Sequence, residues 1–179
     1  MLLITGEYTT GMIRSTMTAV PKRLPVLWGK TGVYALVALV VTVPAAFIAF
    51  FIGQAILSGQ GIQIAFSHAG VPRAIVGAAL YLTLVGLFAM GLGAIMRNTA
   101  AGIATFAGIM FVIAPLVSIL PSSIADSIDP YLPSNAGEAM MRIGHHAHTL
   151  SPGAGLAVFA AYVAAVLAIA AVLLVRRDI

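Results

Sequence analysis

The sequence predicts an all-helical integral membrane protein, and three observations carry the prediction. Only 8% of the 179 residues are charged, whereas soluble domains carry about 25%. Hydrophobic residues make up 61% of the chain, and its mean hydropathy is +1.08. Four apolar stretches reach the ~20 residues that a helix needs to cross the hydrocarbon core. Because so few charges cannot cover a water-facing surface, we expect most of the chain to lie in a membrane.

The first element is the long polar and basic segment within residues 1–30. Four of the nine Lys and Arg residues lie in it, namely Arg14, Lys22, Arg23 and Lys30. Its apolar residues form an irregular stripe made of Tyr8, Met12, Ile13, Met17 and Val20. This pattern predicts an amphipathic helix parallel to the membrane and broken at Pro21 and Pro25. A plain interfacial anchor is the alternative interpretation.

The four predicted spans follow in order and make up a transmembrane domain over residues 31–179. They run over residues 31–57, 74–96, 99–120 and 153–175. Only Arg97 and Asn98 separate the second span from the third, which predicts a tight antiparallel hairpin. Pro44 and Pro115 lie within spans, and each can loosen its helix at one point.

The loop over residues 121–152 carries several helix signals of its own. Asn135 and Glu138 have the spacing of a capping box, with Gly144 as the C-cap of the same short helix. That helix is expected either to lie in the interface or to dip back between the spans. Another short helix is expected to start within residues 123–126 and to end before Pro130, and Pro152 suits the first turn of the fourth span.

The distribution of basic residues predicts the orientation. With the N-terminus inside, seven basic residues lie on the cytoplasmic side and two, Arg73 and Arg142, lie outside. The seven are Arg14, Lys22, Arg23, Lys30, Arg97, Arg176 and Arg177. Cytoplasmic loops collect Lys and Arg. We therefore expect a multi-pass protein of the cell membrane with both termini cytoplasmic and the loop over residues 121–152 outside.

Small residues recur at four-residue spacing in two spans. They are Ala100, Ala104 and Gly108 in the third span and Ala160, Ala164 and Ala168 in the fourth. Small side chains let helix backbones approach within a membrane, so these faces are candidate packing surfaces. The alternative is that they reflect only an alanine-rich composition.

Several function classes are excluded or disfavoured. The predicted spans contain no Asp, Glu, Lys, Arg or His, which argues against a proton relay and against an intramembrane hydrolase. No phosphate-binding motif precedes Lys30, and no cysteine is present. The basic residues are not interleaved with aromatic ones, so nucleic acid is not an expected partner. The chain is not expected to be an enzyme or to hold a cofactor.

One cluster has the chemistry of metal ligands, namely His145, His146 and His148. Imidazole is a common metal ligand, but few carboxylates lie near these residues in the sequence. A solvated outer loop is therefore favoured over a metal site.

Residues 6–16, followed by Pro21, Lys22 and Arg23 and by Lys30 ahead of a span, resemble ABC-2 type permeases. These proteins are the membrane subunits of ATP-binding-cassette exporters. Residues 131–137, between the last two spans, and the ending at residues 176–178 are also similar to that family. The resemblance covers essentially the whole chain.

The resemblance implies that residues 7–17 form a coupling helix that docks on a separate ATPase subunit. The residues expected to make that contact are Glu7, Tyr8, Gly11, Met12, Ile13, Arg14 and Met17. A second permease subunit, identical or different, would complete the transporter. The family usually has six spans and short re-entrant helices in its last outer loop. Four spans are predicted here, and residues 2–5 look like the tail of a missing second span.

Two rival functions stay open at the level of sequence. The chain could be a non-transport scaffold or assembly protein whose basic N-terminal segment binds anionic membrane lipid. It could also be a membrane enzyme that uses the outer histidines with a metal.

Overall fold

The computed structural model describes Thr5 and residues 23–59, 61–144 and 149–176, and within these residues every regular element is helical. Four of the helical stretches are long and apolar enough to cross a membrane. They are Leu24–Ser58, Val71–Met96, Thr99–Val117 and Pro152–Arg176. The predicted all-α membrane fold with four spans is therefore confirmed.

The first long helix, α3 (Arg23–Ser58), begins eight residues before the predicted start at residue 31. Pro25 does not break a helix here, because it lies in the first turn of α3, where a proline leaves no hydrogen bond unmade. The 36 residues of α3 give a length of about 54 Å at 1.5 Å per residue. Since the hydrocarbon core is ~30 Å thick, α3 either tilts or extends beyond it.

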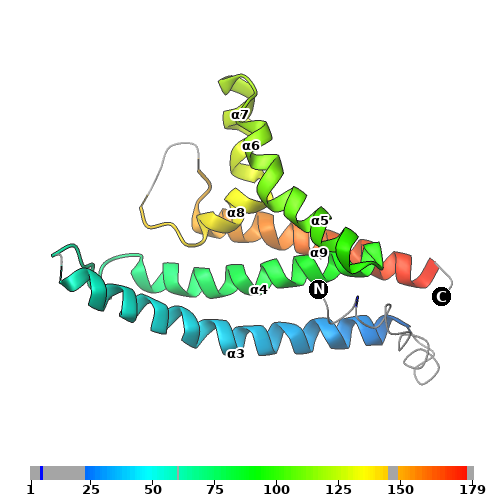
Figure 1. Cartoon of the computed structure of the whole chain (residues 1–179), viewed down its shortest axis with the longest axis horizontal. Helices are drawn as coiled ribbons and strands as arrows, with labels where there is room; N and C mark the ends of the chain where they lie inside the picture. The colour runs from blue at the N-terminus through cyan, green and yellow to red at the C-terminus, as the bar shows by residue number, and fades with distance from the viewer. Residues whose placement is uncertain (1–4, 6–22, 60, 145–148, 177–179) are drawn as a thin grey trace.

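The second long helix, α4 (Val71–Met96), lies at the centre of the bundle. It contacts α3, α5, α8 and α9, and Figure 1 shows it running between α3 and α9. Its buried residues include Phe88, Met90 and Leu92, which form the core together with Phe159 and Leu167. Thr42 of α3 donates a hydrogen bond to the carbonyl of Ala79, at 3.2 Å, which adds a polar link between α3 and α4.

The turn between α4 and α5 (Thr99–Ala107) is as short as the sequence predicts. Arg97 adopts a left-handed conformation with φ of 53°, and its backbone N–H donates to the carbonyl of Gly93. Asn98 is the N-cap of α5, and its side chain accepts a hydrogen bond from the Ala101 N–H at 3.0 Å. The C-cap of α4 and the N-cap of α5 are thus consecutive residues, which ends one helix and begins the next.

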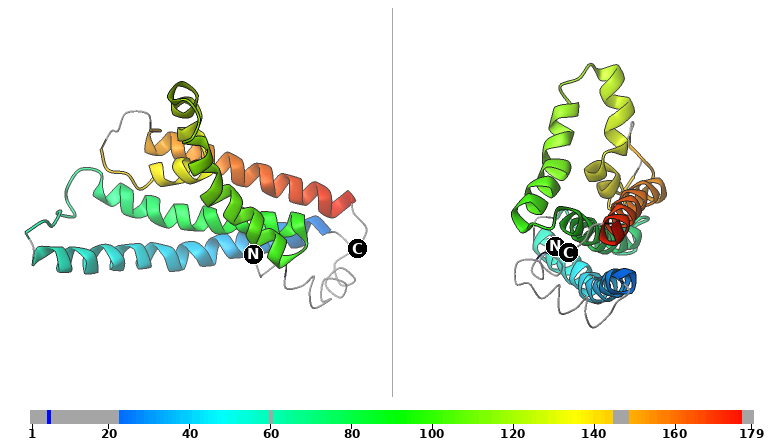
Figure 2. Two further views of the ribbon diagram at one scale, coloured as in Figure 1. Left: turned by 45° about the horizontal axis from the view of Figure 1, so that its top comes forward. Right: turned by 90° about the vertical axis from the view of Figure 1, so that its right-hand side faces the viewer.

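Beyond the turn, the third span departs from the predicted antiparallel hairpin. After α5 the chain forms a π-helical segment, η1 (Gly108–Val112), and then α6 (Ile113–Val117), which contains Pro115. Figures 1 and 2 show this arm rising away from α4 and α9 instead of lying along them. A π-helical turn widens the backbone spiral, and a proline removes a helix donor, so both features can redirect a helix.

The loop after the arm contains α7 (Ser122–Ile128), a 3₁₀ turn η2 (Asp129–Tyr131) and α8 (Pro133–Ala139). The predicted capping box is wrong, because α8 begins at Pro133 and Asn135 lies inside it. The Asn135 amide instead donates to the carbonyl of Asp129, at 2.9 Å. Gly144 has the positive φ of a cap, 89°, but it follows the end of α8 by five residues.

The last helix, α9 (Pro152–Arg176), starts at the predicted proline. Its buried face is formed by Gly155, Phe159, Val163, Leu167 and Ala170. This face is displaced by one residue from the predicted small-residue face, where Ala164 and Ala168 are exposed. Ala100 and Ala104 of α5 are exposed as well. Only Gly108 and Ala160 of the predicted small-residue faces are partly buried, so neither face forms a main packing surface within the described part of the chain.

Candidate functional site

The seven residues predicted to contact an ATPase lie outside the described residues, as does most of the 1–30 segment. The candidate site that the structure does describe lies at the opposite end of the bundle from the start of α3 and the end of α9. There α8 and the residues that follow it pack against the first turns of α4 and α9 (Figures 1 and 2).

Three glycines allow α8 to approach these two helices closely. A methyl group at Gly77 of α4 would overlap the carbonyl of Met140, and one at Gly155 of α9 would overlap the carbonyl of Ala136. A methyl group at Gly137 of α8 would overlap the ring of Tyr81. All three glycines are buried, so the close approach depends on residues that have no side chain.

Aromatic rings continue this contact into the core. Tyr81 lies 5.8 Å from Phe159, ring centre to ring centre, and Phe159 lies 6.0 Å from Phe88. Phe88 in turn lies 6.4 Å from Phe106 of α5. Tilted aromatic pairs at these separations are mutually favourable. The rings therefore link α8, α4, α9 and the base of the arm into one packed unit.

The contacts of α8 bear on the choice between its two predicted placements. Its contacts reach Gly77 and Tyr81, in the second and third turns of α4, and Gly155 in the first turn of α9. Three turns of helix correspond to about 16 Å. If α4 and α9 span the membrane, α8 lies beside them below the interface. The alternative in which the short helix dips back between the spans is the one that the structure favours.

Polar groups gather at the end of this unit that lies next to the start of α4. Arg73 in the first turn of α4 donates to the carbonyl of Arg142, at 3.1 Å. Arg142 forms an ion pair with Glu138 of α8 at 3.4 Å, and both side chains are partly exposed. The hydroxyl of Ser134, by contrast, is buried and has no hydrogen-bond partner among the described residues. Arg73 and Arg142 together tie the segment after α8 to the start of α4.

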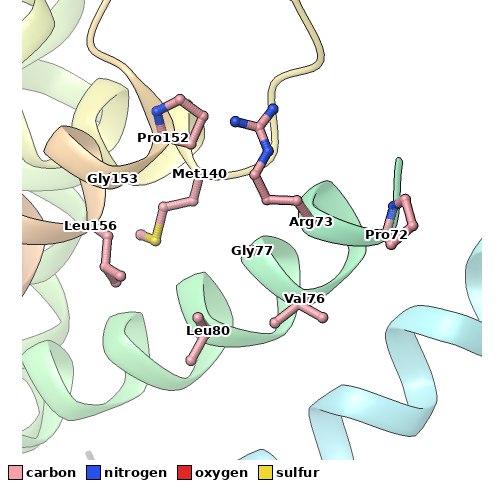
Figure 3. Close-up of a pocket in the computed structure, with 9 residues that line it drawn as sticks. All are labelled: Pro72, Arg73, Val76, Gly77, Leu80, Met140, Pro152, Gly153 and Leu156. Atoms are coloured by element: carbon pink, nitrogen blue, oxygen red, sulfur yellow. The ribbon is translucent and has the colours of Figure 1, made fainter. Parts of the chain in front are cut away.

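A cavity of about 470 Å³ opens beside these groups, between α4, α9 and the residue after α8. Figure 3 shows the side chains that line it, and almost all of them are apolar. Its lining includes the side chains of Arg73, Val76, Leu80, Met140, Pro152 and Leu156. A second cavity of about 670 Å³ shares Arg73 and Pro152 with the first and adds polar lining residues such as Thr149 and Ser151.

The described residues do not form a metal-binding cluster. Among them, no three His, Asp or Glu side chains lie close enough together to hold a metal ion. The Nδ1 atom of the His68 ring lies 3.2 Å from the carbonyl oxygen of Ala69, its own neighbour. The residues of the predicted metal alternative, His145, His146 and His148, lie outside the described residues.

The chain was compared with protein-family models, with curated proteins and with solved structures, and none of them matches.

Sequence reasoning missed the cavity and the role of Arg73 in bounding it. The predicted second span began at residue 74, which left Arg73 in a loop, whereas α4 includes it. The glycines at positions 77, 137 and 155 are the sequence signal that could have indicated the close approach of α8. Their partners are far away in the sequence, and each glycine has many neighbouring small residues that resemble it.

Proposed function

We propose that this chain is the membrane-spanning permease subunit of an ATP-binding-cassette exporter, powered by a separate ATPase subunit. The observation that supports it most is the placement of α7 and α8 between the third and fourth spans, with α8 packed against α4 and α9. Short re-entrant helices in that position are what the resemblance to ABC-2 permeases implies. The membrane-embedded helical fold is compatible with the same function.

The charge distribution of the described helices also suits a pathway whose energy comes from another chain. Their basic residues lie toward the helix ends, at Lys30, Arg73 and Arg176, and the middle of each span is apolar or carries only hydroxyl and amide groups. A proton-driven transporter usually places ionisable groups in mid-membrane. The proposed mechanism is alternating access, in which ATPase closure moves the coupling segment and tilts the helices.

The packing suggests which parts would move together. Helices α4, α8 and α9 share buried glycine contacts and aromatic rings, so we expect them to behave as one rigid body. Helix α3 and the arm from α5 to α7 bury far less of their surface, with Leu36, Val40, Phe111 and Ile119 all more than 60% exposed. These apolar faces suit lipid or a second permease subunit, identical or different.

The test is whether the predicted coupling segment holds an ATPase. The chain is co-expressed with the ATPase subunit encoded nearest to its gene, and the two are purified through a tag on the chain. The double substitution Met12→Ala and Ile13→Ala should abolish retention of the ATPase while the protein still inserts. Truncating a central interface anchor costs ~2 kcal/mol or more, which is about 30-fold in affinity. Arg14→Ala should weaken retention in a salt-dependent way.

The matched control is Thr9→Ala with Thr10→Ala, which removes two side chains from the same segment but leaves its apolar stripe intact. That variant should retain the ATPase. If the Met12 and Ile13 variant retains it fully, the coupling role is refuted. If instead only Lys22→Ala and Arg23→Ala matter, and they act by weakening binding to anionic vesicles, the scaffold alternative replaces the permease.

A further inference from the structure

The cavity beside α8 combines an apolar slot with a cationic rim. Arg73 lies in the first turn of α4, and Leu80 lies two turns further along the same helix, about 10 Å deeper. Between them Val76, Met140 and Leu156 present only aliphatic and thioether surface (Figure 3). A ligand that fits this gradient has an apolar chain at one end and a polar group at the other.

The second cavity extends the same gradient outward. It meets the first at Arg73 and Pro152 and is lined by Gly70, Thr149 and Ser151. Its lining is much more polar than that of the first. A polar headgroup thus has space immediately next to the guanidinium of Arg73, on the side away from the apolar slot.

The charges at the rim favour an anion. Arg142 is already paired with Glu138 at 3.4 Å, so its charge is largely balanced. Among the described residues, Arg73 makes a hydrogen bond to a backbone carbonyl and no ion pair. Its side chain is exposed. Asp126 lines a different cavity. Among the described residues, the junction of the two cavities therefore carries the positive charge of Arg73 with no ion-pair partner. Guanidinium groups bind phosphate oxygens with bidentate geometry.

We propose that this paired cavity binds an anionic phospholipid, with its phosphate on Arg73 and one acyl chain in the slot between α4 and α9. The occupant is a lipid and not a free phosphate, because most of the surface that lines the slot is apolar and would stay unfilled by a soluble anion. The site does not depend on the proposed permease function, and its test uses no ATPase.

The full chain is reconstituted into nanodiscs of phosphatidylcholine that contain spin-labelled phosphatidylglycerol or spin-labelled phosphatidylcholine. The motionally restricted fraction of each gives the relative affinity for the anionic lipid. Arg73→Gln should lower that preference about fivefold, the factor that corresponds to ~1 kcal/mol for one basic residue near a membrane surface. Arg73→Lys should keep most of it, because the charge is preserved.

A second variant tests the apolar slot without touching the charge. Val76 is 41% exposed and lines the slot, so Val76→Phe should fill it and lower the restricted fraction of both lipids. Val40→Phe, on a 65% exposed position of α3, is the matched control and should leave both fractions unchanged. Size-exclusion profiles establish that each variant is folded before it is scored.

Three outcomes would overturn the proposal. The first is an unchanged lipid preference in Arg73→Gln. The second is an equal loss in Arg176→Gln, which removes a basic residue from the far end of the bundle and would indicate a general surface-charge effect. The third is full displacement of the labelled lipid by soluble glycerol phosphate, which would assign the site to a free anion.

Discussion

At the scale of single residues, the packing of α8 depends on glycines. Backbone or ring atoms of a neighbouring helix occupy the space that a side chain at these positions would need. Gly155 of α9 faces the carbonyl of Ala136 and the methyl of Ala139, both on α8. Neither group can rotate away, because a backbone carbonyl and a Cβ are fixed by the helix itself. Gly153, one half-turn earlier in α9, has no atom within 4 Å of the position that a Cβ would occupy. Gly155 and Gly153 therefore lie in the same helix, but only Gly155 has neighbouring atoms where a side chain would be placed.

We predict that Gly155→Ala destabilises the protein by about 1–2 kcal/mol. Overpacking a filled site costs about 1–3 kcal/mol, and the higher helix propensity of alanine returns up to ~1 kcal/mol. Gly153→Ala, which receives only the propensity term, should be neutral or slightly stabilising. Thermal unfolding of both variants in the same detergent measures the difference. Equal melting temperatures would show that α8 does not press against α9 in the membrane.

At the scale of elements, the third span is the least regular of the four. Its α-helical stretch ends at Ala107, and a π-helical segment and a short helix with Pro115 follow. Helix α3 also contains a proline, Pro44, yet it is assigned as one α-helix from Arg23 to Ser58. The comparison indicates that proline alone does not interrupt the α-helix of a span here. In the third span a π-helical segment ends at Val112, three residues before the proline.

We predict that Pro115→Ala shifts the position of the arm relative to α9, because the restored N–H allows a regular α-helical turn to form in place of the π-helical one. The chain has no cysteine, so spin labels can be placed at positions 124 and 161 alone. Pulsed electron–electron distances should move for Pro115→Ala and stay unchanged for Pro44→Ala. If the label-to-label distance in both variants equals that of the unsubstituted chain, tertiary contacts and not Pro115 determine the position of the arm.

At the scale of the whole molecule, four crossings place the start of α3 and the end of α9 at the same end of the bundle (Figure 1). Which end faces the cytoplasm is a prediction from the basic residues, seven against two. The structure refines where that prediction is best tested. Ser127 of α7 is exposed, whereas Glu138, in the same predicted outer loop, is paired with Arg142 beside the bundle.

We predict that an impermeant thiol reagent labels Ser127→Cys in intact cells and does not label Lys22→Cys. Permeabilised cells should label at both positions, which serves as the control for reactivity. The reverse pattern in intact cells would invert the topology. It would also place the cavity beside α8 on the cytoplasmic side.

The sequence alone determined the class of the protein and the number of its spans. Low charge and long apolar stretches are properties of composition, so they need no knowledge of contacts. Local signals were also sufficient for the turn at Arg97 and Asn98 and for the start of α9 at Pro152, since caps and prolines act on their own backbone. The capping box predicted from Asn135, with Gly144 as the C-cap, was wrong. The Asn135 side chain instead contacts Asp129 in a compact turn, which the spacing of residues in the sequence does not reveal.

Only the tertiary structure decided which face of each helix is buried and where α8 lies. In water a buried helix face is apolar and an exposed one is polar, so the pattern reveals the core. In lipid both faces are apolar, and the contrast disappears. The sequence therefore could not distinguish the buried face of α9 from the adjacent face of the same helix. The predicted packing face of Ala160, Ala164 and Ala168 is displaced by one residue from the observed one. The cavity at Arg73 follows from the same cause, because it exists only where α4, α8 and α9 meet.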